Sequence, residues 1–334
     1  MIILHHLSSY GQIAEDARRV LPGLMTWLFE YGRYAVQIFL VMAGYLAAQS
    51  LSRYANTPFS AHGLLKLILN RYLRLFAPYA AALIFTIVCA YIARLWVNDE
   101  FVGESETLTQ FLAHLFFIQG ILGLDSISAG AWYVAIDWQL YSVLAILFLS
   151  FPRYQALIWL LSILAVSSLL FFNRSGDYEA YFIYFIGSYG LGVLAFLASG
   201  FQDAGVKRIA KTALMLIGLI IAGTSFQEIW LRNFLAWFVA LALYLWGDAR
   251  YPAIQEKDSL FKVISWGSRR SYCAFLIHFA FILLANTLYI ALGLHSYESG
   301  ALAIGLMLGV VGCSIVAANY VYRWIEVPAN KLKV

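Results

Sequence analysis

The sequence predicts an all-α protein, a polytopic bundle of transmembrane helices. Of its 334 residues, 62% are hydrophobic and only 12% are charged, whereas soluble proteins carry about 25% charged residues. Long apolar segments recur along the chain, and the charges between them alternate in sign from one connection to the next. The aromatic content of 17% suits the belts of Trp and Tyr found at both surfaces of a bilayer. The lipid bilayer is therefore the first expected partner.

Nine segments are apolar over the length of about 18 residues that a membrane-crossing helix requires. A short apolar run at the N-terminus, MIILHH, is expected to be the outer end of a further helix whose beginning is absent. The predicted bundle thus has about ten helices, the first one truncated. The segment 108–124 is shorter and has a polar side, so we expect an interfacial or re-entrant helix there. The nine apolar segments lie at residues 34–52, 75–97, 130–151, 154–172, 179–199, 211–228, 229–247, 271–292 and 300–324.

The charges of the connections predict an orientation, because short cytoplasmic loops carry an excess of Lys and Arg. The acidic connections are assigned to the outside and carry Asp99, Glu100, Glu104, Glu106, Asp177, Glu179 and Glu298. The basic connections are assigned to the cytoplasm and carry Arg53, Lys66, Arg71, Arg153, Lys207, Arg208, Arg250, Lys257, Lys262, Arg269, Arg270, Lys331 and Lys333. The C-terminus is therefore expected in the cytoplasm. The formal net charge is +4, and no basic run is dense enough to indicate a nucleic-acid partner.

No repeat, low-complexity tract or soluble domain interrupts the chain, so residues 1–334 are predicted to form a single integral-membrane domain. Cys89, Cys273 and Cys313 are odd in number and lack metal-ligand spacing. Neither a structural disulfide nor a metal site is therefore expected. Small residues four apart allow helices to approach closely, and they occur as Ser188 with Gly192 and as Gly305 with Gly309.

The segment AWYVAIDWQLYSV places one acidic residue, Asp137, in an otherwise apolar span. A charged side chain at the centre of a membrane helix costs about 2.5–3.5 kcal/mol, so Asp137 is expected to have a polar partner. Counted from Gly130, its carboxylate lies about 10 Å below the outer surface. Two alternatives stay open. Asp137 orients a histidine and stabilises its charged form, as the acid of a catalytic triad does, or it ties its helix to Arg, Tyr or Trp on a neighbouring one.

Histidines fall at two places of membrane depth. His5 and His6 lie near the outer end of the first helix, and His278 lies about 13 Å beyond Arg269, near the middle of a core about 30 Å thick. Histidine titrates near neutrality and is the usual general base. The alternative is a neutral imidazole that forms a hydrogen bond between helices. His114, on the shorter segment described above, is expected to be solvated.

Arg71 and Arg74 lie three residues apart on one face of a helix that enters from the cytoplasm. Two guanidinium groups at the cytoplasmic surface of the membrane favour a site that binds phosphate groups. The alternative is the positive-inside signal together with contacts to lipid headgroups. In the last helix, Glu326 and Pro328 indicate by themselves only that the helix ends.

Short motifs follow one another along the whole chain. They are MIILHH, then IFLVMAGY, then Arg71 and Arg74 followed by Pro78, then WYVAIDWQLY with Trp132, Asp137, Gln139 and Tyr141, then SYCAFLIHF with Ser271, Tyr272 and His278, and last IEVPANKL with Glu326. In this order the chain resembles acyltransferase family 3, the integral-membrane O-acyltransferases of polysaccharides and lipopolysaccharides. The resemblance covers nearly the whole sequence.

This sequence departs from the family pattern at several points. Asp137 stands where the family has a glutamate, Ala43 stands for a serine, and Phe275 stands for a tyrosine. The family also places an arginine ahead of the first-helix histidine, where this chain has nothing. We therefore expect either a misassigned start or a missing catalytic element.

The resemblance implies transfer of an acyl group, expected to be acetyl, from cytoplasmic acyl-CoA to a hydroxyl of an extracytoplasmic carbohydrate at a bacterial inner membrane. Arg71 and Arg74 would hold the phosphates of the acyl-CoA co-substrate, and no permanently bound cofactor or metal is implied. His5 or His6, oriented by Asp137, would take the proton of the sugar hydroxyl. His278 would line the same enclosed chamber, and an acyl-histidine intermediate is an alternative route. The residues expected to line or support the site are Trp132, Gln139, Tyr141, Ser271, Tyr272 and Glu326.

Two other functions stay open. A transporter or exporter would use the same intramembrane His and Asp as a proton relay or solute site, although the paired internal repeats of secondary transporters are not detectable. The second alternative is that the protein is an inactive family member and serves as an interaction partner. The sequence does not indicate the acceptor, the acyl length or the oligomeric state.

Overall fold

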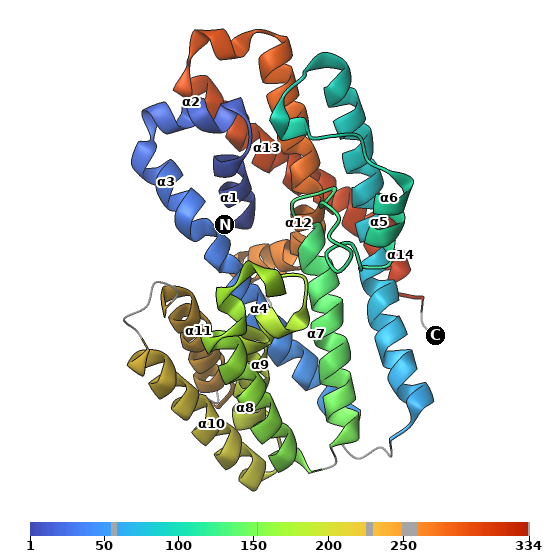
Figure 1. The fold of residues 1–334 in the computed structure, drawn as a ribbon, viewed down its shortest axis with the longest axis vertical. Helices are drawn as coiled ribbons and strands as arrows, with labels where there is room; N and C mark the ends of the chain where they lie inside the picture. The colour runs from blue at the N-terminus through green and yellow to red at the C-terminus, as the bar shows by residue number, and fades with distance from the viewer. Residues whose placement is uncertain (55–58, 152, 225–229, 249–258, 333–334) are drawn as a thin grey trace. The chain divides into compact units, whose positions relative to one another are not determined.

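A computed structural model describes residues 1–54, 59–151, 153–224, 230–248 and 259–332. All regular structure in this described part is helical, with no strand among its residues, which confirms the all-α prediction. The helices in chain order are α1 (Ile2–Ser9), α2 (Gln12–Val20), α3 (Pro22–Tyr31), α4 (Ala35–Leu51), α5 (Ala61–Trp96), α6 (Leu108–Leu115), α7 (Ala131–Ser150), α8 (Tyr154–Leu170), α9 (Phe182–Ser199), α10 (Ala204–Gly223), α11 (Trp230–Asp248), α12 (Ser259–Ala291), α13 (Gly300–Val321) and α14 (Val327–Ala329) (Figure 1).

Seven helical stretches of the described chain are long and apolar enough to cross a membrane. They contain α4, α5, α7, α8, α9, α12 and α13, so the protein is a multi-pass membrane protein. The sequence predicts two further spans, at 211–228 and 229–247, and these correspond to α10 and α11. α10 carries Lys207, Arg208 and Lys211 in its first half, and the apolar part of α11 that is described, Leu231–Gly247, is shorter than a full span.

The helix predicted at 108–124 is shorter than expected. α6 begins at a capping box, in which the Thr107 side chain accepts from the Gln110 backbone N–H and the Gln110 side chain accepts from the Thr107 backbone N–H. The helix ends at Leu115, and Phe117 follows with a positive φ of 59°. Because that backbone conformation does not continue a right-handed helix, the chain turns there.

The backbone contacts divide the chain into two compact units. The first unit comprises Met1–Ala35, Leu73–Val134 and Gln255–Lys333, and the second comprises Val36–Tyr72 and Ala135–Ile254. The boundaries fall inside α5 and α7, which continue from one unit into the other. The single integral-membrane domain stays a prediction.

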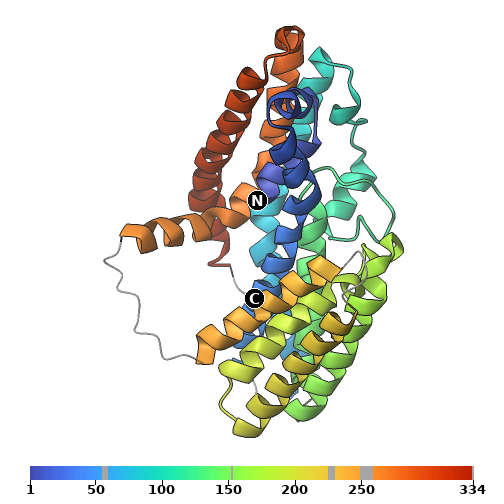
Figure 2. The same ribbon diagram turned by 90° about the vertical axis from the view of Figure 1, so that its left-hand side faces the viewer.

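In the first unit, α12 packs along α13 and the short helix α2 packs against both, while α1 packs against α12 and α3 packs against α1 and α2 (Figures 1 and 2). Leu7, Met25, Ile282 and Met307 belong to the shared hydrophobic core. The turn between α1 and α2 needs Gly11, which has φ 77°, and an added Cβ there would collide with the side chain of Asn286. The first helices are thus held by α12 and α13.

In the second unit, α8, α9, α10 and α11 lie together (Figure 1), with α9 buried over nearly its whole length. α4 crosses α9 in direct backbone contact. An added Cβ at Gly44 would collide with the carbonyl oxygen of Tyr189, and one at Gly192 with that of Val41. This confirms close helix contact at Gly192, whereas an added Cβ at Gly305 meets no described atom within 4 Å.

We expect Gly192→Ala to lower the melting temperature of the purified protein in detergent. The added methyl group must separate α4 from α9, and overpacking of this kind costs about 1–3 kcal/mol. The matched control is Gly309→Ala on α13, where an added Cβ meets open space and alanine favours the helix. Equal melting temperatures for both variants would contradict the close crossing of α4 and α9.

Candidate active site

Two buried polar pairs occupy the positions that the motifs single out. His6 and His278 form one pair in the first unit, and Arg71 and Asp137 form the other in the second unit. That the histidines and Asp137 line a single chamber stays a prediction.

His6 and His278 are joined by a hydrogen bond between α1 and α12. The Nδ1 atom of His6 lies 2.8 Å from the Nε2 atom of His278, and the rings are stacked with their centroids 5.0 Å apart. His278 is completely buried, and His6 is 9% exposed. The interpretation of these histidines as imidazoles bonded between helices therefore describes this contact, and a catalytic role stays a prediction.

The surrounding carbonyl group determines the tautomers of the pair. The Nδ1 atom of His278 lies 2.7 Å from the carbonyl oxygen of Phe275, and a carbonyl oxygen only accepts hydrogen bonds. His278 therefore carries its proton on Nδ1 and, when neutral, accepts at Nε2 from the Nδ1–H of His6. A neutral His6 then keeps the lone pair on its own Nε2. That nitrogen is the basic atom of the pair.

His5 lies beside the pair and is bonded differently. Its Nδ1–H donates to the carbonyl oxygen of Leu28 over 3.1 Å, and its ring centroid is 5.4 Å from that of His6. An added Cβ at Gly32 would collide with the Cβ of His5. The start of the 3-10 turn after α3 thus fixes His5 in place, next to the pair.

Polar residues of α12 hold the first helices against His278. Asn286 accepts at Oδ1 from the backbone N–H of Ile13 (3.0 Å), and the Tyr289 hydroxyl donates to the carboxylate of Asp16 (2.8 Å). Sequence analysis missed these residues. Their spacing gives a signal, because Asn286 and Tyr289 follow His278 by eight and eleven positions, which places all three on one side of a helix.

Phe275 lies about one turn before His278 on α12 and packs beside its ring. Its ring lies 6.1 Å from the ring of His278 and 5.5 Å from that of Tyr133 at the start of α7. An added Cβ at Gly130 would lie 3.0 Å from the Phe275 ring. The residue that departs from the family tyrosine thus packs between His278 and the start of α7.

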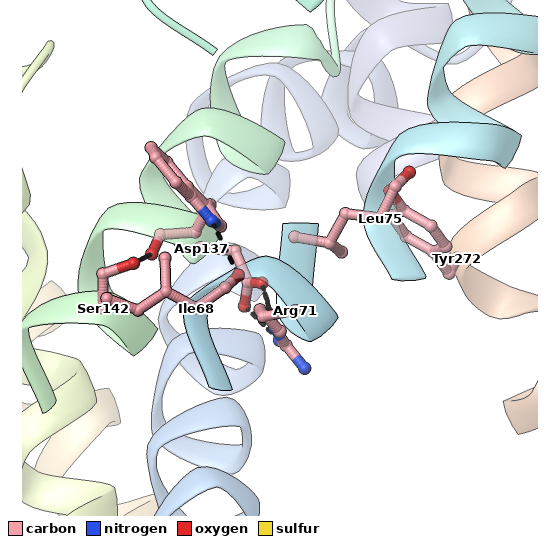
Figure 3. Close-up of polar contacts among 7 residues, drawn as sticks. Ile68, Arg71, Leu75, Asp137, Ser142 and Tyr272 are labelled. Carbon is pink, nitrogen blue, oxygen red and sulfur yellow. Dashed lines mark hydrogen bonds and ion pairs between the residues drawn. The ribbon is translucent and has the colours of Figure 1, made fainter. Parts of the chain in front are cut away.

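Asp137 forms an ion pair with Arg71. Figure 3 shows Arg71, from α5, and Asp137, from α7, pointing toward one another. Nη2 of Arg71 lies 2.6 Å from Oδ2 and 2.8 Å from Oδ1, and Nε lies 3.1 Å from Oδ2. The carboxylate side chain is 6% exposed and the guanidinium side chain 21%. Asp137 therefore has the arginine partner that the second alternative of the sequence analysis describes, and its role toward a histidine stays a prediction.

The ion pair changes the interpretation of the two arginines. Arg71 donates hydrogen bonds from Nε and Nη2 to Asp137, and its guanidinium carbon lies 5.1 Å from the centre of the Tyr141 ring. Arg74, one turn further along α5, is exposed. The two side chains thus have different surroundings, and only Arg74 presents an exposed charge.

The other predicted site residues make local structural contacts. Gln139 bonds the backbone of Ala180 and Phe182 at the start of α9. The Tyr272 hydroxyl donates to the Leu75 carbonyl oxygen over 3.1 Å (Figure 3). The remaining contacts join Ser271 to Ser268, Trp132 to Tyr133, and Glu326 to the Cys273 thiol.

His114 corrects an expectation, because it is not solvated. Its side chain is completely buried, its Nδ1–H donates to the Gln110 carbonyl oxygen (2.8 Å), and its Nε2 accepts from the Ile127 backbone N–H (3.1 Å). Burial lowers the pKa of His114, and the hydrogen bond to Gln110 offsets part of that shift. His114 thus fixes the loop between α6 and α7 in its neutral form.

We expect Asp137→Asn to destabilise the protein by about 3–5 kcal/mol, because it leaves the Arg71 charge buried without its partner. Asp137→Glu keeps the charge and should cost less. Melting temperatures in detergent test both variants, with Arg74→Gln as the exposed control. A wild-type melting temperature for Asp137→Asn would contradict a structural role of the ion pair.

We expect the stability contributed by His114 to depend on pH. Its pKa is below the ordinary 6.5 in the folded state, so the unfolded chain binds this proton more readily. The contribution is complete above about pH 6.5 and is lost as the pH falls below that value. The drop in melting temperature between about pH 7.5 and about pH 5.5 should therefore be smaller in His114→Gln than in the wild type. An equal drop in both proteins would oppose this role.

A comparison with known protein families identifies the family of the chain. A family model, described as an acyltransferase domain and corresponding to acyltransferase family 3, matches residues 1–319. The match contains both buried pairs, and Glu326 lies beyond it. Comparison with curated proteins and with solved structures finds no match. The chain therefore belongs to acyltransferase family 3 and is a multi-pass membrane acyltransferase.

Proposed function

We propose that this membrane acyltransferase moves an acyl group, expected to be acetyl, from cytoplasmic acyl-CoA to a hydroxyl of an extracytoplasmic sugar or polysaccharide. The observation that carries the proposal is the His6–His278 pair, because its tautomers leave a basic nitrogen on His6. The alternation of charged loops supports a bacterial inner-membrane protein with a cytoplasmic C-terminus.

His6 acts as the general base in this proposal. Its Nε2 takes the proton of the sugar hydroxyl while the hydroxyl oxygen attacks the thioester carbonyl carbon. The resulting imidazolium donates from Nδ1 to the neutral Nε2 of His278, whose own Nδ1–H donates to Phe275. His278 thus positions the base and stabilises its charge, the role that an acid plays in a catalytic triad.

The proton taken up by Nε2 of His6 is released again from the same nitrogen. As the new ester bond forms, the carbon–sulfur bond of the thioester breaks, and the leaving thiolate of coenzyme A receives the proton from Nε2 of His6. The base is then neutral again. An acyl-histidine intermediate is the alternative route, since the same lone pair is available for attack on the thioester.

The arginines have separate roles in the proposal. The exposed guanidinium of Arg74 is suited to a phosphate group of acyl-CoA. Arg71 is held by Asp137, so it orders α5 and adds positive charge near Arg74. This modifies the expectation of two equivalent phosphate ligands.

We expect His6→Ala to reduce acyl transfer by about 100-fold to 10,000-fold, the usual effect of losing a general base. His278→Phe should reduce kcat less, because it removes the hydrogen-bond partner and leaves the base in place. His5→Ala serves as the neighbouring control and should retain more activity than His6→Ala. Transfer of radiolabelled acetyl from acetyl-CoA to surface glycan measures all three. Normal acylation by His6→Ala would refute the assignment, and folding is checked by melting temperature.

We expect Arg74→Gln to raise the KM for acetyl-CoA and to leave the melting temperature unchanged. The physical reason is the loss of a charge-assisted bond to phosphate, at an exposed side chain that holds no helix in place. Arg71→Gln should instead lower the melting temperature, because it leaves Asp137 without its ion-pair partner. Initial rates at varied acetyl-CoA concentrations measure this KM. An unchanged KM in Arg74→Gln would mean that Arg74 contributes only to the positive charge of the cytoplasmic side.

A further inference from the structure

An open depression of about 380 Å³ lies in the first unit, between α1, α2 and α3. This volume falls in the range of small-molecule sites, about 300–1,000 Å³. Ser8 and Ser9 of α1 form one side of it, Glu15 and Arg18 of α2 a second, and Thr26 and Phe29 of α3 the third. Its chemistry therefore comes from hydroxyl groups, one carboxylate, one guanidinium group and one aromatic ring.

Three lining residues of the depression, Ser8, Ser9 and Phe29, contact His5. The hydroxyls of Ser8 and Ser9 both donate to the backbone carbonyl oxygen of His5, each over 2.7 Å. The ring of Phe29 lies 6.3 Å from the ring of His5, which is 5.4 Å from the ring of His6. A molecule in the depression thus touches residues that contact His5, the neighbour of the proposed base His6.

The lining matches a ligand rich in hydroxyl groups. A sugar hydroxyl both donates and accepts a hydrogen bond. The carboxylate of Glu15 accepts, and the guanidinium of Arg18 donates. The hydroxyl protons of Ser8 and Ser9 are used on His5; Ser8 is completely buried, so the half-buried Ser9 is the serine whose oxygen is left to accept from a ligand.

An aromatic surface completes the site. Phe29 is 49% exposed, and the guanidinium carbon of Arg18 lies 5.8 Å from the centre of its ring. The apolar face of a pyranose, which presents C–H groups, packs on such a ring while its rim of hydroxyls bonds the neighbouring polar groups. The two charges of the lining, Glu15 and Arg18, also cancel, which favours a neutral ligand over a phosphate or a carboxylate.

We propose that this depression is the acceptor subsite, which binds a neutral pyranose unit and delivers a hydroxyl to the histidines. The inference rests on the proposed function, since it takes the acceptor to be a carbohydrate. It adds which residues recognise that acceptor. The sequence-based orientation agrees with this assignment, because it places the connection between the first helix and the 34–52 span on the extracytoplasmic side.

The test measures binding and turnover separately. Saturation-transfer difference NMR on the purified full chain in detergent uses methyl glycosides of glucose, galactose, mannose and rhamnose as probes. We expect signals from at least one neutral glycoside in the wild type and their loss in Phe29→Ala. Trp27→Ala is the matched control, an exposed aromatic on the same helix outside the depression. Absent binding in the wild type, preferential binding of glucuronate or glycerol phosphate, or equal loss in both variants would overturn the inference.

Kinetics then separate the subsite from the reaction. With radiolabelled acetyl-CoA and the glycoside that binds, we expect Phe29→Ala and Glu15→Gln to raise the acceptor KM about tenfold, the equivalent of about 1.4 kcal/mol, at an unchanged KM for acetyl-CoA. Glu30→Gln, an exposed carboxylate of α3 outside the depression, is the control for Glu15. Wild-type transfer with unaltered acceptor KM in both variants overturns the subsite and leaves the proposed function standing. A wild type that binds glycoside and transfers no acetyl group to it or to surface glycan overturns the proposed function and leaves the binding site standing.

Discussion

The hydrogen bond between His6 and His278 is the contact on which the proposed chemistry of this protein depends. Both imidazoles are buried, so a ring nitrogen that faces a polar protein group must be matched to it, donor to acceptor. The carbonyl oxygen of Phe275 takes one proton, and this single requirement propagates through the pair to leave a lone pair on His6. The lone pair on Nε2 of His6 is thus specified by one backbone oxygen, the carbonyl oxygen of Phe275.

That bond in turn depends on packing, because α1 has only eight residues and a helix of this length is not stable alone. Asn286 and Tyr289 of α12 bind the chain just after α1, at Ile13 and Asp16. α12 therefore supplies both His278 and the groups that keep the opposite histidine in reach. The same three N-terminal helices form the walls of the depression beside His5, so one packing arrangement serves the base and the proposed acceptor subsite.

In the second unit, the structure offsets the cost of placing the carboxylate of Asp137 in a membrane-spanning helix. Asp137 receives Nε and Nη2 of Arg71 in a bidentate arrangement, and the pair offsets the desolvation of both charges. The family glutamate and the aspartate of this chain are alike in charge and differ by one methylene group. Arg71 meets the shorter side chain here, while Tyr141 packs near its guanidinium carbon.

The sequence by itself determined the features that follow from local physics. Hydropathy and length predicted an all-helical, multi-pass membrane protein, and the cost of a charge in lipid predicted a polar partner for Asp137. It left open whether that partner was a histidine or an Arg, Tyr or Trp of a neighbouring helix. The predicted spans at 211–228 and 229–247 correspond to α10 and α11, and residues 225–229 lie outside the described chain, so these two spans stay predictions. His114 was misjudged, since its burial comes from a loop that folds back onto α6.

Tertiary structure alone decided which groups meet. No sequence spacing relates His6 to His278, which are 272 positions apart, and the tautomers follow only from the position of the Phe275 carbonyl oxygen. The depression formed by α1, α2 and α3 is likewise built from residues of three helices that have no motif of their own. Hydropathy and helical periodicity are properties of consecutive residues, so they predict the individual helices of this protein. Hydrogen bonds and cavities depend on distances between helices and arise only when the chain has folded.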